Sequence, residues 1–244
     1  MDKNFDNVYE DGLRAESYAR LEFPGTYYLA FRDIPNLISE HVKGKRALDF
    51  GCGTGRSSRF LEKLGFETIG VDIAEPMIRK AREFNPQGDY RLIGNDGPTG
   101  LGETAFDLIL SAFTFDNIST LEKKTALFSA LRSLLSPDGR IINLVSSPEI
   151  YTHEWASFTT IDFPENRDAK SGDKVKIIMT DVEDRRPVED ILFADDAYRA
   201  VYEEAGLETA IKHAPLGQAD EPYAWVNETE IAPWVIYVLK AKRP

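Results

Sequence analysis

The sequence predicts an α/β protein whose core is a doubly wound, mostly parallel sheet, interrupted by an insertion of antiparallel hairpins. From residue 46 to residue 147, short apolar runs alternate with stretches of helical spacing. Three glycines, Gly51, Gly53 and Gly55, follow the first apolar run directly and precede a helical pattern. After residue 147 the alternation stops, and the apolar runs that follow indicate antiparallel strands.

The alternating part has helices with recognisable ends. The first helix stops at Gly65, and the second has Pro76 in its first turn, where proline is tolerated. We expect strands at residues 46–50, 66–72, 90–96, 106–115 and 140–147, alternating with helices at 55–65, 74–84 and 120–136. On the helix expected at 120–136, Leu121, Leu127, Leu131 and Leu134 are expected to lie on or near one apolar stripe.

The flanking parts of the chain are less regular. A helical spacing over residues 29–42 is interrupted near Pro35, and a short helix is expected around residues 12–21. The runs at 154–163, 174–181 and 188–194 indicate antiparallel strands or hairpins. A helix at 195–206, stopped by Gly206, precedes a final strand pair at 207–214 and 234–242.

Composition narrows the range of partners. The formal charge is −12, with 41 acidic against 29 basic residues, so a nucleic-acid phosphate backbone would be repelled. We expect no membrane association, because no run of eighteen apolar residues occurs and the N-terminus lacks a signal-peptide pattern. The single cysteine, Cys52, favours a reducing cytoplasm. A monomer or a homodimer is expected.

The glycine-rich turn suggests what kind of ligand is bound. Such a turn lets a ligand approach the backbone and presents free N–H groups at the start of a helix. Dinucleotide sites have the spacing G-x-G-x-x-G, whereas here the third position after Gly53 is Arg56. A carboxylate at Asp49, two residues before the first glycine, would repel a pyrophosphate and attract an ammonium group.

These residues resemble a known family. "LDFGCGTGR" at 48–56, followed by "GVDIAEPMI" at 70–78, is similar to the first two motifs of class I S-adenosylmethionine-dependent methyltransferases. Residues 95–96 and 106–118 match the later motifs of the family in position and character. The resemblance implies a Rossmann-like, seven-stranded methyltransferase fold and S-adenosyl-L-methionine as cofactor, with S-adenosyl-L-homocysteine as product. The implied segments are an N-terminal helical cap (1–45), a cofactor-binding core (46–147), inserted hairpins over the acceptor site (148–194) and a C-terminal completion of the core (195–244).

The resemblance also implies roles for individual residues. The three glycines would let the methionine part lie against the backbone, and Asp49 would attract its ammonium group, directly or through water. Asp72 would accept hydrogen bonds from both ribose hydroxyls, as a carboxylate can. The remaining cofactor contacts are implied for Ile73 and Met77 beside the adenine ring, Asp96 and Gly97 at its polar edge, Ser111, Ala112 and Phe113 near the sulfonium, and Tyr18, Cys52 and Thr54 around the turn. Tyr9, Tyr28 and Arg32 are further candidates, beside Tyr18, for an N-terminal segment that closes over the cofactor.

Structural roles remain open for several of these residues. Asp72 and Asp96 are also typical cap or turn residues, and Met77 is suited to a core. Cys52 is expected to be a packing residue rather than a nucleophile. The N-terminal tyrosines are equally suited to packing on the edge of the sheet.

The acceptor is predicted to be a small molecule, methylated at O, N or C mainly through positioning. The tetrapeptides that the family uses to methylate nucleobases and glutamine are absent, and "SAFT" occupies residues 111–114 instead. If a base is needed, His153 is the candidate, because it follows the fifth predicted strand near the crevice. Residues expected to line the acceptor pocket are Phe115, Asn117, Tyr151 and Trp155. The alternatives are a nicotinamide-dependent oxidoreductase and a non-catalytic S-adenosylmethionine-binding module.

Overall fold

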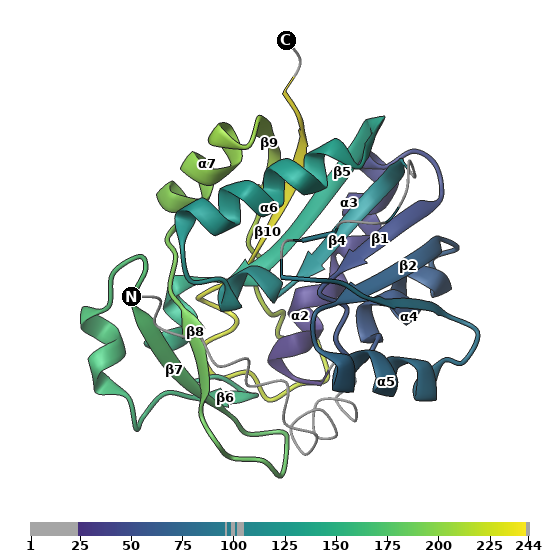
Figure 1. The fold of residues 1–244 in the computed structure, drawn as a ribbon. Helices are drawn as coiled ribbons and strands as arrows, with labels where there is room; N and C mark the ends of the chain where they lie inside the picture. Colours follow the sequence, from purple (N-terminus) through teal and green to yellow (C-terminus); the bar gives the residue numbers. More distant parts are fainter. Residues whose placement is uncertain (1–23, 96, 99–100, 102–104, 243–244) are drawn as a thin grey trace.

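The computed structural model describes residues 24–95, 97–98, 101 and 105–242, and its centre is a seven-stranded sheet (Figure 1). The strand order is β3-β2-β1-β4-β5-β10-β9, in which β10 runs antiparallel to both of its neighbours and the other pairs are parallel. The strands are β1 (Arg46–Phe50), β2 (Glu67–Asp72), β3 (Asp89–Leu92), β4 (Phe106–Ala112), β5 (Leu135–Ser146), β9 (Leu207–His213) and β10 (Trp234–Ala241). The predicted fold class is confirmed.

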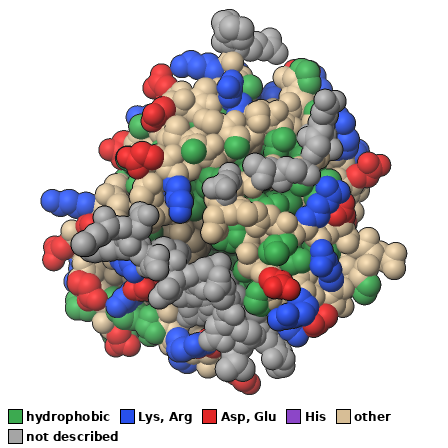
Figure 2. Space-filling view, viewed as in Figure 1, with side chains coloured by type: hydrophobic (Ala, Val, Ile, Leu, Met, Phe, Trp, Pro, Cys, Tyr) green, Lys and Arg blue, Asp and Glu red, His purple; other side chains and the backbone are tan. Residues whose placement is uncertain are grey.

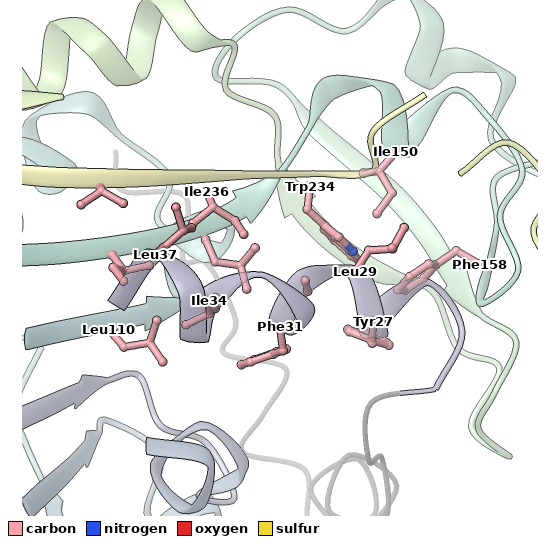
Figure 3. Close-up of a cluster of buried hydrophobic side chains, with 14 of the residues drawn as sticks. Tyr27, Leu29, Phe31, Ile34, Leu37, Leu110, Ile150, Phe158, Trp234 and Ile236 are labelled. Carbon is pink, nitrogen blue, oxygen red and sulfur yellow. The ribbon is translucent and has the colours of Figure 1, made fainter. Parts of the chain in front are cut away.

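Helices cover both faces of this sheet. One face packs against α2 (Thr26–Arg32), α3 (Ile34–His41) and α4 (Arg56–Lys63), through buried side chains such as Leu29, Ile34 and Leu61. Figure 3 shows this cluster, with the α2–α3 side chains facing Leu110 and Ile236 of the strands. The other face packs against α6 (Leu121–Ser133) and α7 (Asp195–Glu204), and α5 (Glu75–Phe84) lies along β2 and β3.

The buried stripe of α6 differs from the predicted one. Its buried residues are Lys124, Phe128 and Leu131, at helical spacing, whereas Leu121 is 42% exposed. Phe128 stacks on Phe115, with ring centroids 3.9 Å apart. The sequence pattern placed the leucines at the centre of the stripe, and the structure places a lysine there.

Two strands end earlier than predicted. β4 ends at Ala112, because Phe113 takes a left-handed conformation (φ 64°) and a 3₁₀ helix, Thr114–Asn117, follows. β3 ends at Leu92, and the chain then turns through a short bridge between Gly94 and Gly97. Both ends lie at the edge of the sheet where the crevice forms, so these turns shape the site.

The insertion forms a second, antiparallel sheet of three strands. These are β6 (Phe158–Thr159), β7 (Lys174–Met179) and β8 (Val188–Ile191), in the order β6-β7-β8. The first predicted strand, over 154–163, is thus reduced to two residues, and the 3₁₀ helices Pro148–Tyr151 and Pro164–Asp168 flank it. An antiparallel insertion is confirmed, while the division at residues 45, 147 and 194 stays a prediction.

A buried glutamate fastens the insertion to the core. Glu228 Oε1 accepts hydrogen bonds from Thr26 Oγ1 at 2.6 Å and from the Ala156 amide at 2.8 Å. The indole of Trp234 also donates to the Thr26 carbonyl at 2.8 Å. These contacts join the start of α2, the insertion and the start of β10, which together form the walls of the site described below.

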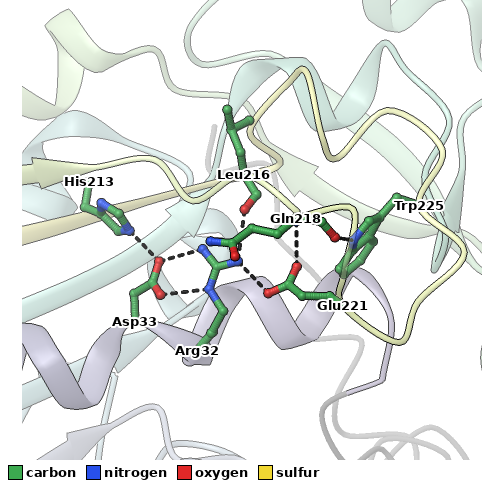
Figure 4. A network of polar contacts seen from close by, with 7 residues as sticks. All are labelled: Arg32, Asp33, His213, Leu216, Gln218, Glu221 and Trp225. Carbon is green, nitrogen blue, oxygen red and sulfur yellow. Dashed lines mark hydrogen bonds and ion pairs between the residues drawn. The ribbon is translucent and has the colours of Figure 1, made fainter.

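A polar network anchors the other end of α2 (Figure 4). Arg32 donates to Asp33 at 2.8 and 2.9 Å, to Glu221 at 2.8 Å and to the Leu216 carbonyl at 3.0 Å. Asp33 also contacts His213 at 2.7 Å, and the hydrogen bond from Arg32 lowers the pKa of Asp33. Arg32 is therefore held by the 214–233 loop, and its closing over a cofactor stays a prediction.

Charged side chains of both signs are dispersed over one face of the molecule. On the face drawn in Figure 2, Lys and Arg side chains alternate with Asp and Glu side chains among the described residues. Within the same described part of the chain, every helix is too short or too polar to cross a membrane.

Candidate functional site

Most of the predicted cofactor residues lie at the carboxyl ends of β1, β2 and β4, where the strand order reverses; we call this edge of the sheet the crevice. β1 pairs with β2 on one side and β4 on the other, so Asp49 lies opposite both Gly70 and Leu110. Open α/β sheets bind ligands at such a reversal. The glycine turn follows β1 directly, Asp72 is the last residue of β2, and Phe113 follows β4 directly.

The glycine turn has room for a ligand at one position only. Gly51, Gly53 and Gly55 all have positive φ, at 75°, 53° and 80°. A Cβ on Gly51 would lie 2.1 Å from Thr114 Oγ1, and one on Gly55 would lie 2.8 Å from the Tyr90 ring. A Cβ on Gly53 would meet no described atom within 4 Å. The first and third glycines therefore serve packing, and the middle one leaves the backbone open to a ligand.

Asp49 supplies a buried carboxylate beneath this turn. Its Oδ2 accepts hydrogen bonds from Ser57 Oγ at 2.7 Å and Ser58 Oγ at 2.6 Å, both at the start of α4. Its Oδ1 is buried and has no hydrogen-bond partner among the described residues. Burial raises the pKa of Asp49 to about 6. Because an unpartnered buried carboxylate oxygen is costly, this atom fits a cationic group, held directly or through water.

Asp72 is held in place by backbone amides. Its Oδ2 accepts from the Gly53 amide and its Oδ1 from the Ala74 amide, both at 2.8 Å. Each oxygen keeps a further lone pair for a ligand hydroxyl. Burial raises the pKa of Asp72. Beside it, Ile73 is 47% exposed and offers an apolar surface to a planar ring, whereas Met77 is buried against Ala74.

Several other residues that were predicted to contact the cofactor are packed against the rest of the protein. Ser111 is buried on the same face of β4 as Ile109, facing α6 and α7, so its side chain does not point into the crevice. Cys52 packs against Ile78 and Tyr90, and burial raises the pKa of its thiol. Thr54 and Gly97 are buried, and Ala112 is half-buried at the end of β4. Tyr28 packs against Tyr223, with centroids 4.9 Å apart. Three predicted residues, Tyr9, Tyr18 and Asp96, lie outside the described residues.

A cavity opens beside Phe113, between the large sheet and the insertion. The space open to a water-sized sphere is about 60 Å³, and the unfilled space counted out to the solvent at the opening is about 490 Å³. Aromatic side chains from α2, β6 and β10 form much of its wall, namely Tyr27, Phe158 and Trp234. The second sheet closes it with residues such as Met179 and Asp190. We call this space the acceptor cavity.

Only some of the residues predicted to line the acceptor pocket lie at this cavity. Asn117 and Tyr151 line the cavity. Phe115 does not, because the turn at Phe113 directs its ring into the core against α6. Trp155 is buried, with its indole donating to the Ile150 carbonyl at 2.8 Å. His153 lies at the surface outside the described lining, 3.4 Å from Glu149, so its place as a base has no support from this geometry.

The ionisable groups at the cavity were missed from the sequence. Asp116 accepts from the Ser146 amide at 3.0 Å, and Asp190 accepts from Tyr151 Oη at 3.0 Å. Behind them the buried Lys124 donates to the Phe115 carbonyl. Burial raises the pKa of Asp116 and lowers that of Lys124. The available signals were a carboxylate inside the apolar run "VEDILF" and a lysine at the centre of the α6 stripe.

Comparisons with known proteins agree with this crevice. Residues 48–141 match a family described as "Methyltransferase domain". A ubiquinone biosynthesis O-methyltransferase of Roseobacter denitrificans is 30% identical over 166 residues, covering 59% of this chain and 65% of that protein. A cypemycin N-terminal methyltransferase of Streptomyces is 26% identical over 134 residues, covering 54% of this chain and 55% of that protein. The chain thus spans somewhat over half the length of these two relatives.

Solved structures share the whole architecture. The CcbJ methyltransferase of Streptomyces caelestis has a TM-score of 0.67 and 19% identity, covering 97% of this chain and 98% of that one. An S-adenosylmethionine-dependent methyltransferase of Clostridium acetobutylicum has a TM-score of 0.62 and 14% identity, covering 98% of each chain.

Strand order, glycine turn and strand-end carboxylates define the class of this protein as a Rossmann-like, ligand-binding α/β protein. Within that class, residues 48–141 match the methyltransferase-domain family, which supports the class I S-adenosylmethionine-dependent methyltransferase that the motifs predict. The predicted cofactor, S-adenosylmethionine, is thereby confirmed for the family. Which residues contact S-adenosylmethionine remains a prediction. The positions of Asp49, Gly53 and Asp72 are compatible with it.

Proposed function

We propose that this protein transfers a methyl group from S-adenosylmethionine to a small-molecule acceptor. The observation that carries the proposal is Oδ1 of Asp49, which is buried beneath the open backbone of Gly53 and has no partner among the residues that the structure describes. That pair of features suits an amino-acid-bearing cation and not a pyrophosphate, which disfavours the nicotinamide alternative.

Each side chain would have a defined task. Asp49 would hold the ammonium group, Asp72 the ribose hydroxyls and Ile73 one face of the adenine ring. When bound, the cofactor supplies a methyl group on a positively charged sulfur. The chain itself would hold the acceptor in line with that methyl group and exclude water, for which no catalytic side chain is obligatory.

The acceptor would occupy the acceptor cavity. Of the relatives named above, one is described as an O-methyltransferase and one as an N-terminal methyltransferase, so relatedness leaves the accepting atom open. Residues of the predicted insertion (148–194), such as Tyr151 and Asp190, line part of the cavity, which supports placing the acceptor there. Three properties stay expectations from the sequence. They are a location in the cytoplasm, a monomeric or homodimeric state, and the absence of nucleic-acid and membrane partners.

Titration calorimetry tests the cofactor part of the proposal. We expect saturable binding of S-adenosylhomocysteine and no heat with NADH; binding of NADH alone would favour the oxidoreductase. Transfer of labelled methyl from S-adenosylmethionine into a metabolite extract then separates an enzyme from a non-catalytic binding module. Binding without any transfer would support the module.

A further inference from the structure

We propose that the acceptor carries an O–H or N–H group on an apolar, ring-sized body, and that the side-chain oxygen of Asn117 accepts a hydrogen bond from this group. The inference rests on the proposed function, because it names the substrate class and an orienting residue of the same reaction. It follows from the way the turn after β4 is built and from the wall of the acceptor cavity.

The turn that carries Asn117 is fastened on two sides. It is the 3₁₀ helix Thr114–Asn117, which follows β4. Thr114 Oγ1 donates to the Phe50 carbonyl at the end of β1, at 2.9 Å. The carboxylate of Asp116 accepts from the Ser146 amide at the end of β5, at 3.0 Å. The turn is therefore fixed between the crevice and the acceptor cavity.

The amide group of Asn117 is held at its nitrogen and unpaired at its oxygen. Its Nδ2 donates to the Phe113 carbonyl at 3.2 Å, and this bond sets the direction of the amide. Its Oδ1 is shielded from solvent and has no hydrogen-bond partner among the residues that the structure describes. Asn117 also lines the acceptor cavity. Because a buried carbonyl oxygen without a donor is costly, a ligand that brings an O–H or N–H group to it would be favoured.

A second buried asparagine provides a matched comparison. Asn143 Oδ1 also lacks a partner within the described part of the chain, and its Nδ2 donates to Tyr202 Oη at 2.8 Å. Tyr202 belongs to α7, so Asn143 faces the opposite side of the sheet, and it is outside the lining of the acceptor cavity. The two residues share an unpaired buried oxygen and differ in their access to the cavity.

The wall around Asn117 suits an apolar body. The rings of Phe113 and Trp234 have centroids 4.8 Å apart, those of Tyr27 and Phe158 are 5.1 Å apart, and all four line the cavity. Figure 3 shows Tyr27, Phe158 and Trp234 coming from different elements to the same place. Small-molecule sites combine such apolar walls with a few polar groups that fix the orientation of the ligand. The hydrogen-bond donor would thus be the polar end of a mainly apolar acceptor.

Charged groups of both signs also surround the cavity. Lys124 interacts electrostatically with Asp116 and Asp190, and Arg56 is part of the cavity lining. A charged probe would therefore respond to these groups as well as to Asn117. Uncharged probes isolate the Asn117 hydrogen bond.

Phenol, aniline and toluene are suitable probes, because they share one ring and are uncharged near neutral pH. They differ in the group that would face Asn117, which is O–H, N–H or methyl. Asn117→Leu keeps a side chain of similar size and removes the accepting oxygen. Each probe is titrated into the protein–S-adenosylhomocysteine complex by calorimetry or ligand-observed NMR.

We expect Asn117→Leu to weaken phenol binding, aniline binding or both by roughly threefold to tenfold relative to toluene, which corresponds to one hydrogen bond between uncharged groups. A loss confined to phenol identifies an O–H acceptor, and a loss confined to aniline identifies an N–H acceptor. S-adenosylhomocysteine binding should be unchanged, and Asn143→Leu should leave the relative affinities of the three probes as they are in the wild type. If Asn117→Leu does not fold, Asn117→Ala carries the same expectation.

The outcomes separate the two proposals. The inference is overturned if toluene loses as much affinity as phenol and aniline, if neither donor loses affinity, or if neither binds the wild-type complex. It is also overturned if Asn143→Leu has the same effect as Asn117→Leu. Failure of S-adenosylhomocysteine to bind the wild-type protein overturns the proposed function instead.

Discussion

Asp49→Asn tests whether the buried carboxylate at the glycine turn is there for a ligand. Burial raises the pKa of Asp49 from 3.8 to about 6, a shift of roughly two units, each equivalent to about 1.36 kcal/mol. The ionised carboxylate thus costs the folded protein about 3 kcal/mol at pH 7.5. Asparagine removes the charge and can still contact Ser57 and Ser58. We expect the free energy of unfolding to rise by about 1–2 kcal/mol, which raises Tm by about 3–6 °C.

Cofactor binding should respond in the opposite direction. Losing a hydrogen bond to a charged group costs about 1.5–3 kcal/mol, which corresponds to a loss of roughly tenfold to hundredfold in S-adenosylhomocysteine affinity. Calorimetry at pH 7.5 and thermal unfolding of the ligand-free protein measure the two effects. A variant that is less stable and binds the ligand normally would refute the reasoning, since Asp49 would then only support the start of α4.

The pH dependence has a definite sign. Between pH 3.8 and about 6 the folded protein holds a proton on Asp49 that the unfolded chain has lost. The Asp49 contribution therefore lowers stability as pH rises through this window, and the reduction persists above it. Ligand affinity should change the other way: it weakens as pH falls below about 6, by up to about tenfold per unit, and it becomes flat in Asp49→Asn.

Four further substitutions test the roles of Asp72, the glycine turn and the α6 packing. Asp72→Ala removes the acceptor for the ribose hydroxyls and should weaken S-adenosylhomocysteine binding at least about tenfold by calorimetry; unchanged affinity would remove Asp72 from the site. Gly53→Ala should weaken S-adenosylhomocysteine binding and lower the free energy of unfolding in urea by only about 1 kcal/mol. Gly51→Ala should mainly destabilise the fold, because its Cβ would lie 2.1 Å from Thr114 Oγ1. The reverse pattern would contradict the assignment of Gly53 to ligand binding and of Gly51 to packing. Phe128→Ala should cost about 3–5 kcal/mol in urea unfolding, since it removes the ring stacked on Phe115; a loss below about 1 kcal/mol would show that this contact is dispensable.

The cofactor side of the molecule was largely predictable from the sequence. The alternation of apolar runs and helical patterns defined the parallel strands, because strands buried on both faces are apolar throughout. Asp49, the glycines and Asp72 are adjacent to strand ends along the chain, so topology alone brings them to one edge. The positions of these residues depend on the local sequence and on the right-handed connection between parallel strands, and both can be inferred from the sequence.

The acceptor side was not predictable in the same way. Phe115 was expected at the pocket because it follows β4, but the left-handed turn at Phe113 directs it into the core. Asp190 reaches the cavity through packing of the second sheet, which no local pattern encodes. Lys124 occupies a position that a polarity pattern assigns to solvent, since apolar periodicity cannot represent a buried cation.

A crystal structure of the protein with S-adenosylhomocysteine tests the central claim most directly. We expect the ammonium group at Asp49, directly or through one water molecule, with the ribose hydroxyls on Asp72 and the sulfur facing the acceptor cavity. Density for the ligand elsewhere, or a crevice in which Asp49 Oδ1 gains no partner, would contradict it.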